Sequence, residues 1–171
     1  LPILATGVTR AMLDAAAKKD QHAIRYCNLL GIPVVMDNGR PISIVQGRTQ
    51  IAITPEMNTT PRYLYFRQAH VGSVEFDPTT VGDSIARWDG DSLIVDTVGF
   101  KGDLGIVGIP GGGYRTEATN LVERYRLIDA NTLSITFTWI DPKVYRTPHT
   151  YEFRYNRLNS QTYVPQGNPP C

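Results

Sequence analysis

His149 stands at the head of a segment, residues 147–157, in which aromatic and polar side chains alternate. Side chains alternate between the two faces of a β-strand, so His149 is expected to share a face with Tyr151 and Phe153. That aromatic face is the expected interior of the molecule. Histidine exchanges protons near neutral pH, which makes His149 a candidate general acid. The alternative is a core histidine that is hydrogen-bonded to a backbone carbonyl.

Two carboxylates on other strand-like segments are candidate general bases. Glu123 alternates with Leu121 and Tyr125, and a carboxylate among apolar neighbours must be paired or must hold its proton more tightly. The alternative for Glu123 is a buried ion pair with an arginine, such as Arg124 or Arg62. Asp96 ends a segment that leads into a glycine-rich connection, where ligand contacts concentrate. Its alternative is a turn-stabilising aspartate.

Aromatic and imidazole side chains complete the predicted site. Tyr65 is the candidate oxyanion donor, and His149, Glu123, Asp96 and Tyr65 form the predicted catalytic set. The predicted substrate-binding side chains are Tyr63, His70, Trp88, Tyr125, Trp139, Tyr151 and Phe153. Lone tyrosines on strands are also often structural.

Spacing motifs for other chemistries are absent from the sequence. There is no G-x-S-x-G elbow, no H-E-x-x-H or C-x-x-C spacing and no dinucleotide fingerprint. The glycine-rich stretch 99–115 continues as Tyr114-Arg115 and lacks the Lys-Ser/Thr of a phosphate loop. We therefore expect no metal and no cofactor, and interpret residues 99–115 as a flap over the mouth of a barrel.

Composition describes a globular domain. The chain has 171 residues, of which 42% are hydrophobic and 19% charged, and a net charge of +1. One domain of this size can bury a core. The near-zero charge, without basic runs, argues against nucleic acid as the partner. No apolar stretch approaches the ~20 residues needed to span a bilayer. A homo-oligomer is compatible with the sequence.

Hydrophobic periodicity predicts one helix followed by strands. Thr9 is the expected N-cap of a helix from Arg10 to about Cys27. Period-two segments then follow, and Asp89-Gly90 and Asp129-Ala130-Asn131 are the expected hairpin turns. The expected strands are Pro41–Gln46, Thr49–Thr54, Pro61–Gln68, Ser84–Trp88, Ser92–Val98, Leu121–Leu127, Thr132–Ile140 and Thr147–Arg157.

Sequential hairpins favour an antiparallel β-barrel of about eight strands with one N-terminal helix, and a barrel of that size can hold one small ligand. The expected single domain, 1–171, comprises an extension and helix (1–33), the barrel (34–158) and a tail (159–171). The sequence has two cysteines, Cys27 and Cys171, for which free thiols and a disulfide are both open. A disulfide between them, together with a first residue other than methionine, would favour a secreted or periplasmic protein.

The segment from Arg87 to Phe100 resembles the pattern W-[DE]-G-D-[ST]-L-V-V-D-T-x-G-F of a family of small secreted bacterial proteins. Glu117, Glu123-Arg124-Tyr125, the run from Asp129 to Leu133, and the run from Asp141 to Tyr145 with Pro148 follow in the same order. The resemblance covers about residues 40–155. It implies an exported protein with a calycin-like or lipocalin-like barrel, and it supplies no catalytic residues. Members often carry histidine near the end of the glycine-rich stretch and at the position of Asn120, and tryptophan at that of His149.

Three functions fit these patterns. The first is a cofactor-independent acid–base enzyme, of the lyase, isomerase or cyclase type, that acts on a small apolar or aromatic molecule in a barrel cavity. The second is a non-catalytic periplasmic binder of a hydrophobic small molecule. The third is an interaction module that uses residues 63–66 and exposed sheet edges. The polar side chains on the expected inner faces favour the first.

Overall fold

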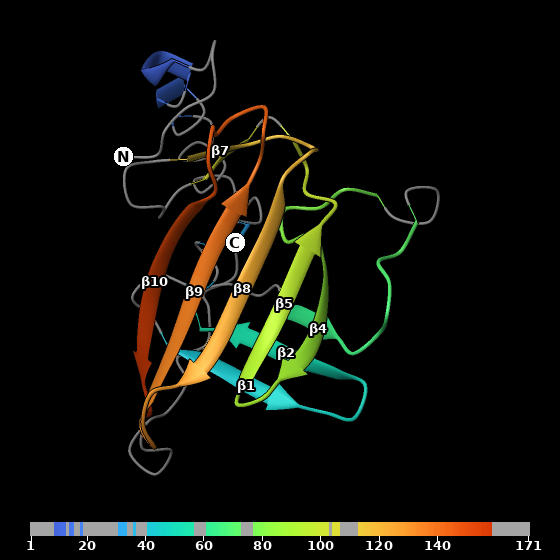
Figure 1. Cartoon of the computed structure of the whole chain (residues 1–171), viewed down its shortest axis with the longest axis vertical. Helices are drawn as coiled ribbons and strands as arrows, with labels where there is room; N and C mark the ends of the chain where they lie inside the picture. Colours follow the sequence, from blue (N-terminus) through green and yellow to red (C-terminus); the bar gives the residue numbers. More distant parts are fainter. Residues whose placement is uncertain are drawn as a thin grey trace.

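The structure is a computed structural model whose described residues are mainly β, with one short helix among them near the N-terminus (Figure 1). It describes residues 9–12, 14, 15, 18, 31–33, 36, 41–56, 61–72, 77–102, 104–106 and 113–158. Cys27 and Cys171 lie outside these residues, as do residues 159–171, the predicted tail.

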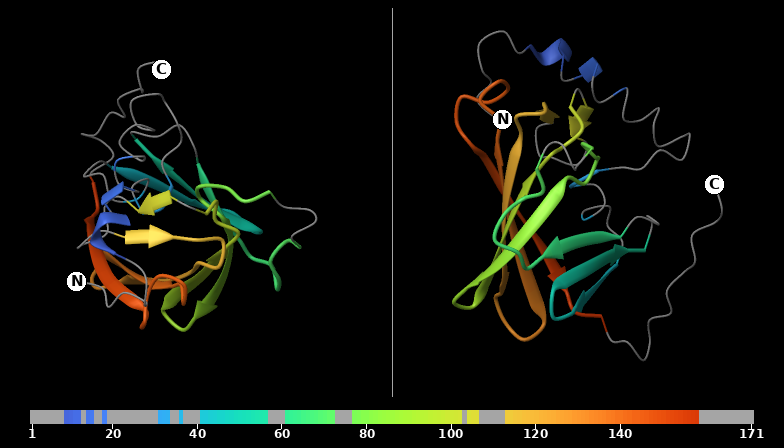
Figure 2. Two further views of the ribbon diagram at one scale, coloured as in Figure 1. Left: turned by 90° about the horizontal axis from the view of Figure 1, so that it is seen from above. Right: turned by 90° about the vertical axis from the view of Figure 1, so that its right-hand side faces the viewer.

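Eight strands form one strongly curled sheet, a half-barrel whose curvature is clearest from above (Figure 2). Their order across the sheet is β1-β2-β3-β4-β5-β8-β9-β10, and β6 and β7 form a separate two-stranded sheet. The strands are β1 (Ile42–Gln46), β2 (Gln50–Pro55), β3 (Arg62–Tyr65), β4 (Asp83–Asp89), β5 (Ser92–Val98), β6 (Leu104–Ile106), β7 (Gly113–Arg115), β8 (Asn120–Leu127), β9 (Thr132–Ile140) and β10 (His149–Asn156). The expected β-barrel class with eight strands and an N-terminal helix is confirmed, in the form of a half-barrel.

The junction between β3 and β4 differs from every other junction in the sheet. It is parallel, whereas the other neighbours are antiparallel. It is also the shortest, since its register consists only of Leu64 with Ser84 and Tyr65 with Ile85. A parallel pair needs a crossover connection, so a simple hairpin turn cannot join Tyr65 to Asp83. The expectation that sequential hairpins would suffice is therefore corrected at this position.

The concave face of the sheet carries the hydrophobic core. Strand alternation places its residues there, and the register aligns them from strand to strand, as in the row Leu93, Tyr125 and Ile135. The buried apolar side chains are Ile32, Met36, Ile51, Ile53, Leu64, Ala86, Leu93, Val95, Phe100, Leu121, Tyr125, Ile135, Phe137, Trp139, Val144 and Tyr145. The convex face carries the alternate residues of each strand, and it is more polar.

The N-terminal helix begins as the sequence predicts. The Thr9 hydroxyl accepts a hydrogen bond from the Met12 amide at 3.3 Å, which is the contact of an N-cap residue. Residues 10–12, 14, 15 and 18 are helical, and the predicted continuation to Cys27 falls outside the described residues. Ile32 and Met36 are buried in the core, so the end of the predicted extension, residues 1–33, already contributes to the core of the half-barrel.

The glycine-rich connection contains two short strands rather than only a loop. β6 and β7, which follow β5 and precede β8 in the sequence, pair antiparallel with each other. The interpretation of residues 99–115 as a flap stays a prediction, and the connection is less irregular than expected because residues 104–106 and 113–115 pair as strands. Sequence alternation could not reveal these strands, because each has three residues and glycine occurs in both.

One buried aspartate joins two connections at the same end of the sheet. The Asp141 carboxylate accepts hydrogen bonds from the Thr116 amide at 2.9 Å, the Thr116 and Thr119 hydroxyls, and the Lys143 amide at 3.0 Å. It therefore ties the turn before β8 to the turn before β10. This contact gives the Asp141-Pro142-Lys143 part of the sequence resemblance a structural role.

Candidate functional site on the convex face

The predicted catalytic residues lie on two faces of the sheet. Glu123 on β8 faces the core, and its register partner on β5 is Val95. Asp96 is the next residue of β5 and points to the opposite, convex face. Tyr65 belongs to the same convex row, because Tyr65 pairs with Ile85 and Ile85 pairs with Asp96. The structure thus brings Tyr65 and Asp96 to one face and separates Glu123 from both.

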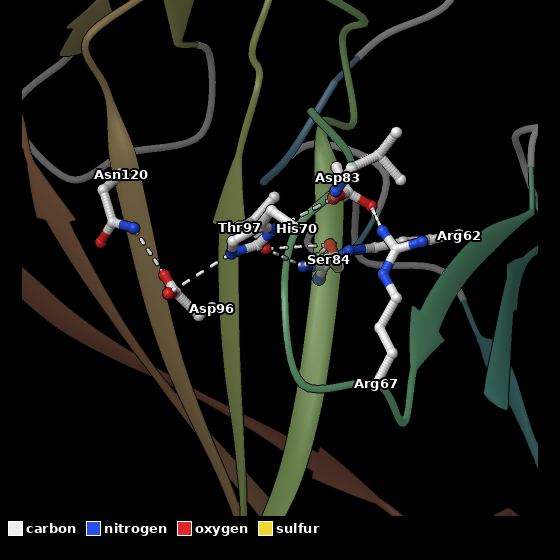
Figure 3. A network of polar contacts seen from close by, with 9 residues as sticks. Arg62, Arg67, His70, Asp83, Ser84, Asp96, Thr97 and Asn120 are labelled. Carbon is white, nitrogen blue, oxygen red and sulfur yellow. Dashed lines mark hydrogen bonds and ion pairs between the residues drawn. The ribbon is translucent and has the colours of Figure 1, made fainter. Parts of the chain in front are cut away.

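A histidine joins two aspartates on this convex face (Figure 3). His70 Nδ1 lies 3.0 Å from an oxygen of Asp83, and His70 Nε2 lies 3.5 Å from an oxygen of Asp96. Asp83 is 4% exposed, whereas the Asp96 side chain is 43% exposed. The imidazole therefore connects a buried carboxylate with a carboxylate that solvent reaches.

The Asp83 carboxylate has two further contacts besides the one with His70. It forms an ion pair with Arg67 and accepts a hydrogen bond from the Val71 amide at 3.0 Å. Asp96 is held on its other side, where Asn120 of β8 donates its amide to Oδ1. We refer to Arg67, His70, Asp83 and Asp96 as the outer cluster.

The local sequence explains how the outer cluster forms. β3 ends at Tyr65 instead of continuing to Gln68 as predicted, and the Arg67 guanidinium lies 4.8 Å from the centre of the Tyr65 ring. The chain then turns so that His70 reaches the sheet. Gly82, with a φ of 67°, precedes Asp83. That backbone conformation favours glycine, and it delivers Asp83 to the start of β4.

Glu123 belongs to a second cluster on the concave face, which we call the inner network. Arg62 donates from Nη1 to Glu123 Oε1 at 2.8 Å and from Nη2 to Oε2, forming a bidentate ion pair. The Tyr125 hydroxyl donates to Glu123 Oε1 at 2.9 Å. Ser84 and Thr97 accept from Arg62 Nη2 at 3.1 Å and 3.0 Å. Arg62 and Glu123 are 1% and 0% exposed.

The inner network perturbs two ionisation equilibria. Burial acts to lower the pKa of Arg62, but the charge of Glu123 and its hydrogen bonds outweigh burial and raise this pKa above its ordinary value. Burial, followed by the charge of Glu123, raises the pKa of the Tyr125 phenol well above the usual 10.0. Both glutamate oxygens already accept hydrogen bonds from Arg62 or Tyr125, so the pairing alternative for Glu123 is the arrangement observed.

His149 lies apart from both clusters, in a row of aromatic rings along β9 and β10. Its ring is 5.6 Å from that of Tyr151, which in turn lies 5.4 Å from Phe137 and 5.2 Å from Phe153. Trp139 donates its indole N–H to the Tyr151 hydroxyl at 2.9 Å. The predicted sharing of one face by His149, Tyr151 and Phe153 agrees with the burial pattern of β10.

The remaining predicted contacts lie elsewhere. Tyr125 belongs to the inner network, and His70 to the outer cluster. Tyr63 is 40% exposed on the convex face. Trp88 is 53% exposed at the end of β4. The predicted site residues therefore divide among the outer cluster, the inner network, the aromatic row and the exposed surface, and do not line one cavity together.

The sequence did not indicate that Asp83 and Arg67 belong to a site. Asp83 sits 13 positions after His70 with a crossover between them, so no spacing rule links the two. The only local signal is a glycine before an aspartate at a strand start, and that pattern is common in turns. The sequence indicates Arg62 only as a possible ion-pair partner for Glu123, and that is the role it has.

Within the ranges that the structure describes, no three His, Cys, Asp or Glu side chains are arranged to hold a metal ion. In those same ranges no helix is long and apolar enough to cross a membrane. Comparison with family models, with curated proteins and with solved structures finds no match to this chain.

Proposed function

We propose that the chain is a cofactor-independent acid–base enzyme in which His70 is the proton acceptor and donor. The observation that supports this proposal is the position of one imidazole between two carboxylates of opposite exposure, 3.0 Å from Asp83 and 3.5 Å from Asp96. A base oriented by a buried acid is the arrangement that general base catalysis uses.

Three members of the outer cluster, His70, Asp83 and Asp96, have distinct parts in this chemistry. An ionised carboxylate only accepts hydrogen bonds, so Asp83, 3.0 Å from Nδ1, holds the proton of His70 on that nitrogen, whereas the 3.5 Å from Nε2 to Asp96 is longer than a usual N–H···O hydrogen bond. The lone pair of His70 is then on Nε2, which faces the solvent-reached Asp96. When Nε2 takes a proton from the substrate, Asp96 stabilises the imidazolium that forms, and the same nitrogen returns the proton to another atom of the substrate. Asp96 is thus a second charged group beside the reacting atoms.

Apolar side chains beside the outer cluster favour a small apolar or aromatic substrate. Ile85 and Val122 are the register partners of Asp96 on its two sides, and both are partly exposed on the convex face. A substrate lying along this row would contact hydrocarbon while presenting an acidic C–H to His70. Moving a proton within one molecule is the chemistry of an isomerase, a cyclase or a lyase.

The experiment is proton abstraction from 5-nitrobenzisoxazole, a small aromatic probe whose ring opens to a coloured phenolate when a base removes its C–H proton. We expect saturable turnover that falls by about 10²–10⁴-fold in His70→Gln, the range for loss of a general base. Asp83→Asn should lower the rate as well, because it no longer fixes the proton on Nδ1.

Arg126→Ala is the matched control, because Arg126 forms an exposed ion pair with Asp91 far along β8. Its rate should equal that of the unchanged chain. Equal turnover in His70→Gln and in the control, with both variants folded, would remove His70 from the chemistry and leave the outer cluster a purely structural tie.

A second candidate function, a binder of a hydrophobic small molecule, is favoured by the aromatic row. Phe137 and Tyr151 stack with an interplanar angle of 12°, and Tyr151, Phe153 and Tyr155 are only partly buried although they belong to the concave face. Such a surface suits a flat apolar ligand. Mass spectrometry of small molecules released from the purified chain tests it, and Phe153→Ala should reduce their yield while His70→Gln should not.

Export to the periplasm or the exterior is part of this proposal, and it is supported by the sequence resemblance. Cell fractionation tests it directly. A mass difference between reduced and unreduced protein would reveal a bridge between Cys27 and Cys171.

A further inference from the structure

We propose that strands β1, β2 and β3 open as one unit at the β3–β4 junction, and that this opening admits a small apolar molecule to the concave face. The inference goes beyond the acid–base proposal, because it concerns the opposite face of the sheet and does not depend on turnover by His70.

The first support is the small number of paired residues between β3 and β4. Only Leu64 with Ser84 and Tyr65 with Ile85 are in register there, whereas β8 and β9 pair from Asn120 to Leu127. A sheet separates most easily where the fewest ladder hydrogen bonds must break. Local openings of this kind have lower free energies than global unfolding.

The second support is that side chains close this same junction on both faces. On the concave face Arg62 of β3 reaches across to Ser84 on β4, Thr97 on β5 and Glu123 on β8. On the convex face Arg67, just after β3, forms an ion pair with Asp83 at the start of β4. Figure 3 draws both arginines close to β4.

The two sets of contacts differ in how readily solvent can replace them. Arg62 and Glu123 are buried completely, while the Arg67 side chain is 32% exposed. The inner network therefore keeps the open state rare, and the convex contact is the one that water can compete for. The core side chains Ile51, Ile53 and Leu64 of the moving unit would separate from the rest of the hydrophobic core and leave room for a small apolar molecule.

Hydrogen exchange of the full chain, read by mass spectrometry, tests the opening. We expect peptides from β2 and β3 to exchange together, and faster than peptides from β8 and β9. Arg67→Ala should speed exchange of β2 and β3 by about tenfold, the effect of losing a hydrogen bond to a charged group, and leave β8 and β9 unchanged. Arg126→Ala, which breaks an exposed ion pair elsewhere, should change neither.

A disulfide across the junction supplies the converse experiment. Tyr65→Cys combined with Ile85→Cys joins two register partners. In the oxidised protein β2 and β3 should exchange as slowly as β8 and β9, and binding of the fluorescent apolar probe 1-anilinonaphthalene-8-sulfonate should fall. Reduction should restore both.

Three results would overturn the inference. They are equal exchange of β2, β3, β8 and β9 in the unchanged chain, acceleration of every strand alike by Arg67→Ala, and probe binding that is the same in the oxidised and reduced double variant. None of these results bears on proton transfer by His70, so the two proposals fail separately.

Discussion

Arg62 and Glu123 form a bidentate, fully buried ion pair although two strands, β4 and β5, lie between them in the sheet. The pair therefore spans β4 and β5 on the concave face of the curled sheet. Both ions have lost their water, and the hydrogen bonds from Tyr125 and to Ser84 and Thr97 replace part of it. Such a pair is costly to break from one side only.

Glu123→Leu should therefore destabilise the fold by about 3–5 kcal/mol, because it leaves the Arg62 charge buried without a partner. Arg62→Met in the same chain should recover much of this loss. Urea denaturation measures both. Arg124→Ala is the matched control, since its ion pair with Asp89 is exposed, and its effect should lie within about 1 kcal/mol. A double variant as unstable as Glu123→Leu alone would contradict this account.

Stability should fall at high pH because of Tyr125. Its phenol has a pKa raised by burial above the unfolded value of 10.0. Below pH 10 both states keep the proton. Above it the unfolded chain releases the proton while the folded chain retains it, so stability is lost as pH rises towards the folded pKa. Tyr125→Phe should flatten this part of the pH–stability curve.

Tyr63→Phe is the control for that experiment, because Tyr63 is exposed on the convex face. It should leave the alkaline slope unchanged. The slopes come from urea midpoints measured between neutral pH and pH 11. Identical slopes for the two variants would show that Tyr125 is not the group responsible.

Two glycines with left-handed backbone should respond differently to alanine. A Cβ on Gly82 would lie 2.7 Å from the Val98 carbonyl oxygen, whereas a Cβ on Gly90 meets nothing within 4 Å. Gly90→Ala should cost only the backbone strain, about 1–2 kcal/mol, and Gly82→Ala distinctly more. Thermal denaturation compares them, and equal losses would contradict the close approach at Gly82.

Asp141→Ala should loosen one end of the barrel. It removes the buried acceptor of the hydrogen bonds from Thr116, Thr119 and Lys143, at a cost of about 3 kcal/mol. Asp129→Ala is the control, since the hydrogen bonds of Asp129 with Asn131 and Thr132 are exposed to solvent and their loss should cost distinctly less. Urea midpoints that fall equally in the two variants would count against the role given to Asp141.

Alternation in the sequence predicted the strands and their faces where the strands are long. Ser92–Val98 and Thr132–Ile140 have the predicted bounds, and the Asp-Gly hairpin forms with Gly90 at a φ of 61°. A period of two is a local property, so it can be seen without knowing the neighbours of a strand. The aromatic face of β10 followed from the same reasoning.

Alternation along a single strand does not predict which distant segments pair with each other. β3 has four residues, and nothing in them distinguishes a parallel neighbour from an antiparallel one. The candidate site depends on that pairing, because the parallel neighbours β3 and β4 bring His70, five residues after β3, to Asp83 at the start of β4. The sequence therefore supplied Asp96 and His70 as separate candidates, but their contact and the role of Asp83 required the structure.

The crossover between β3 and β4 has a consequence for how the chain can change. A tight turn cannot join two parallel strands, so some length must always remain between Tyr65 and Asp83. A deletion between Tyr65 and Asp83 that removes His70 should leave the hairpins of β4 with β5 and of β8 with β9 paired. Loss of the proposed acid–base activity can thus be separated from loss of the fold by shortening one connection.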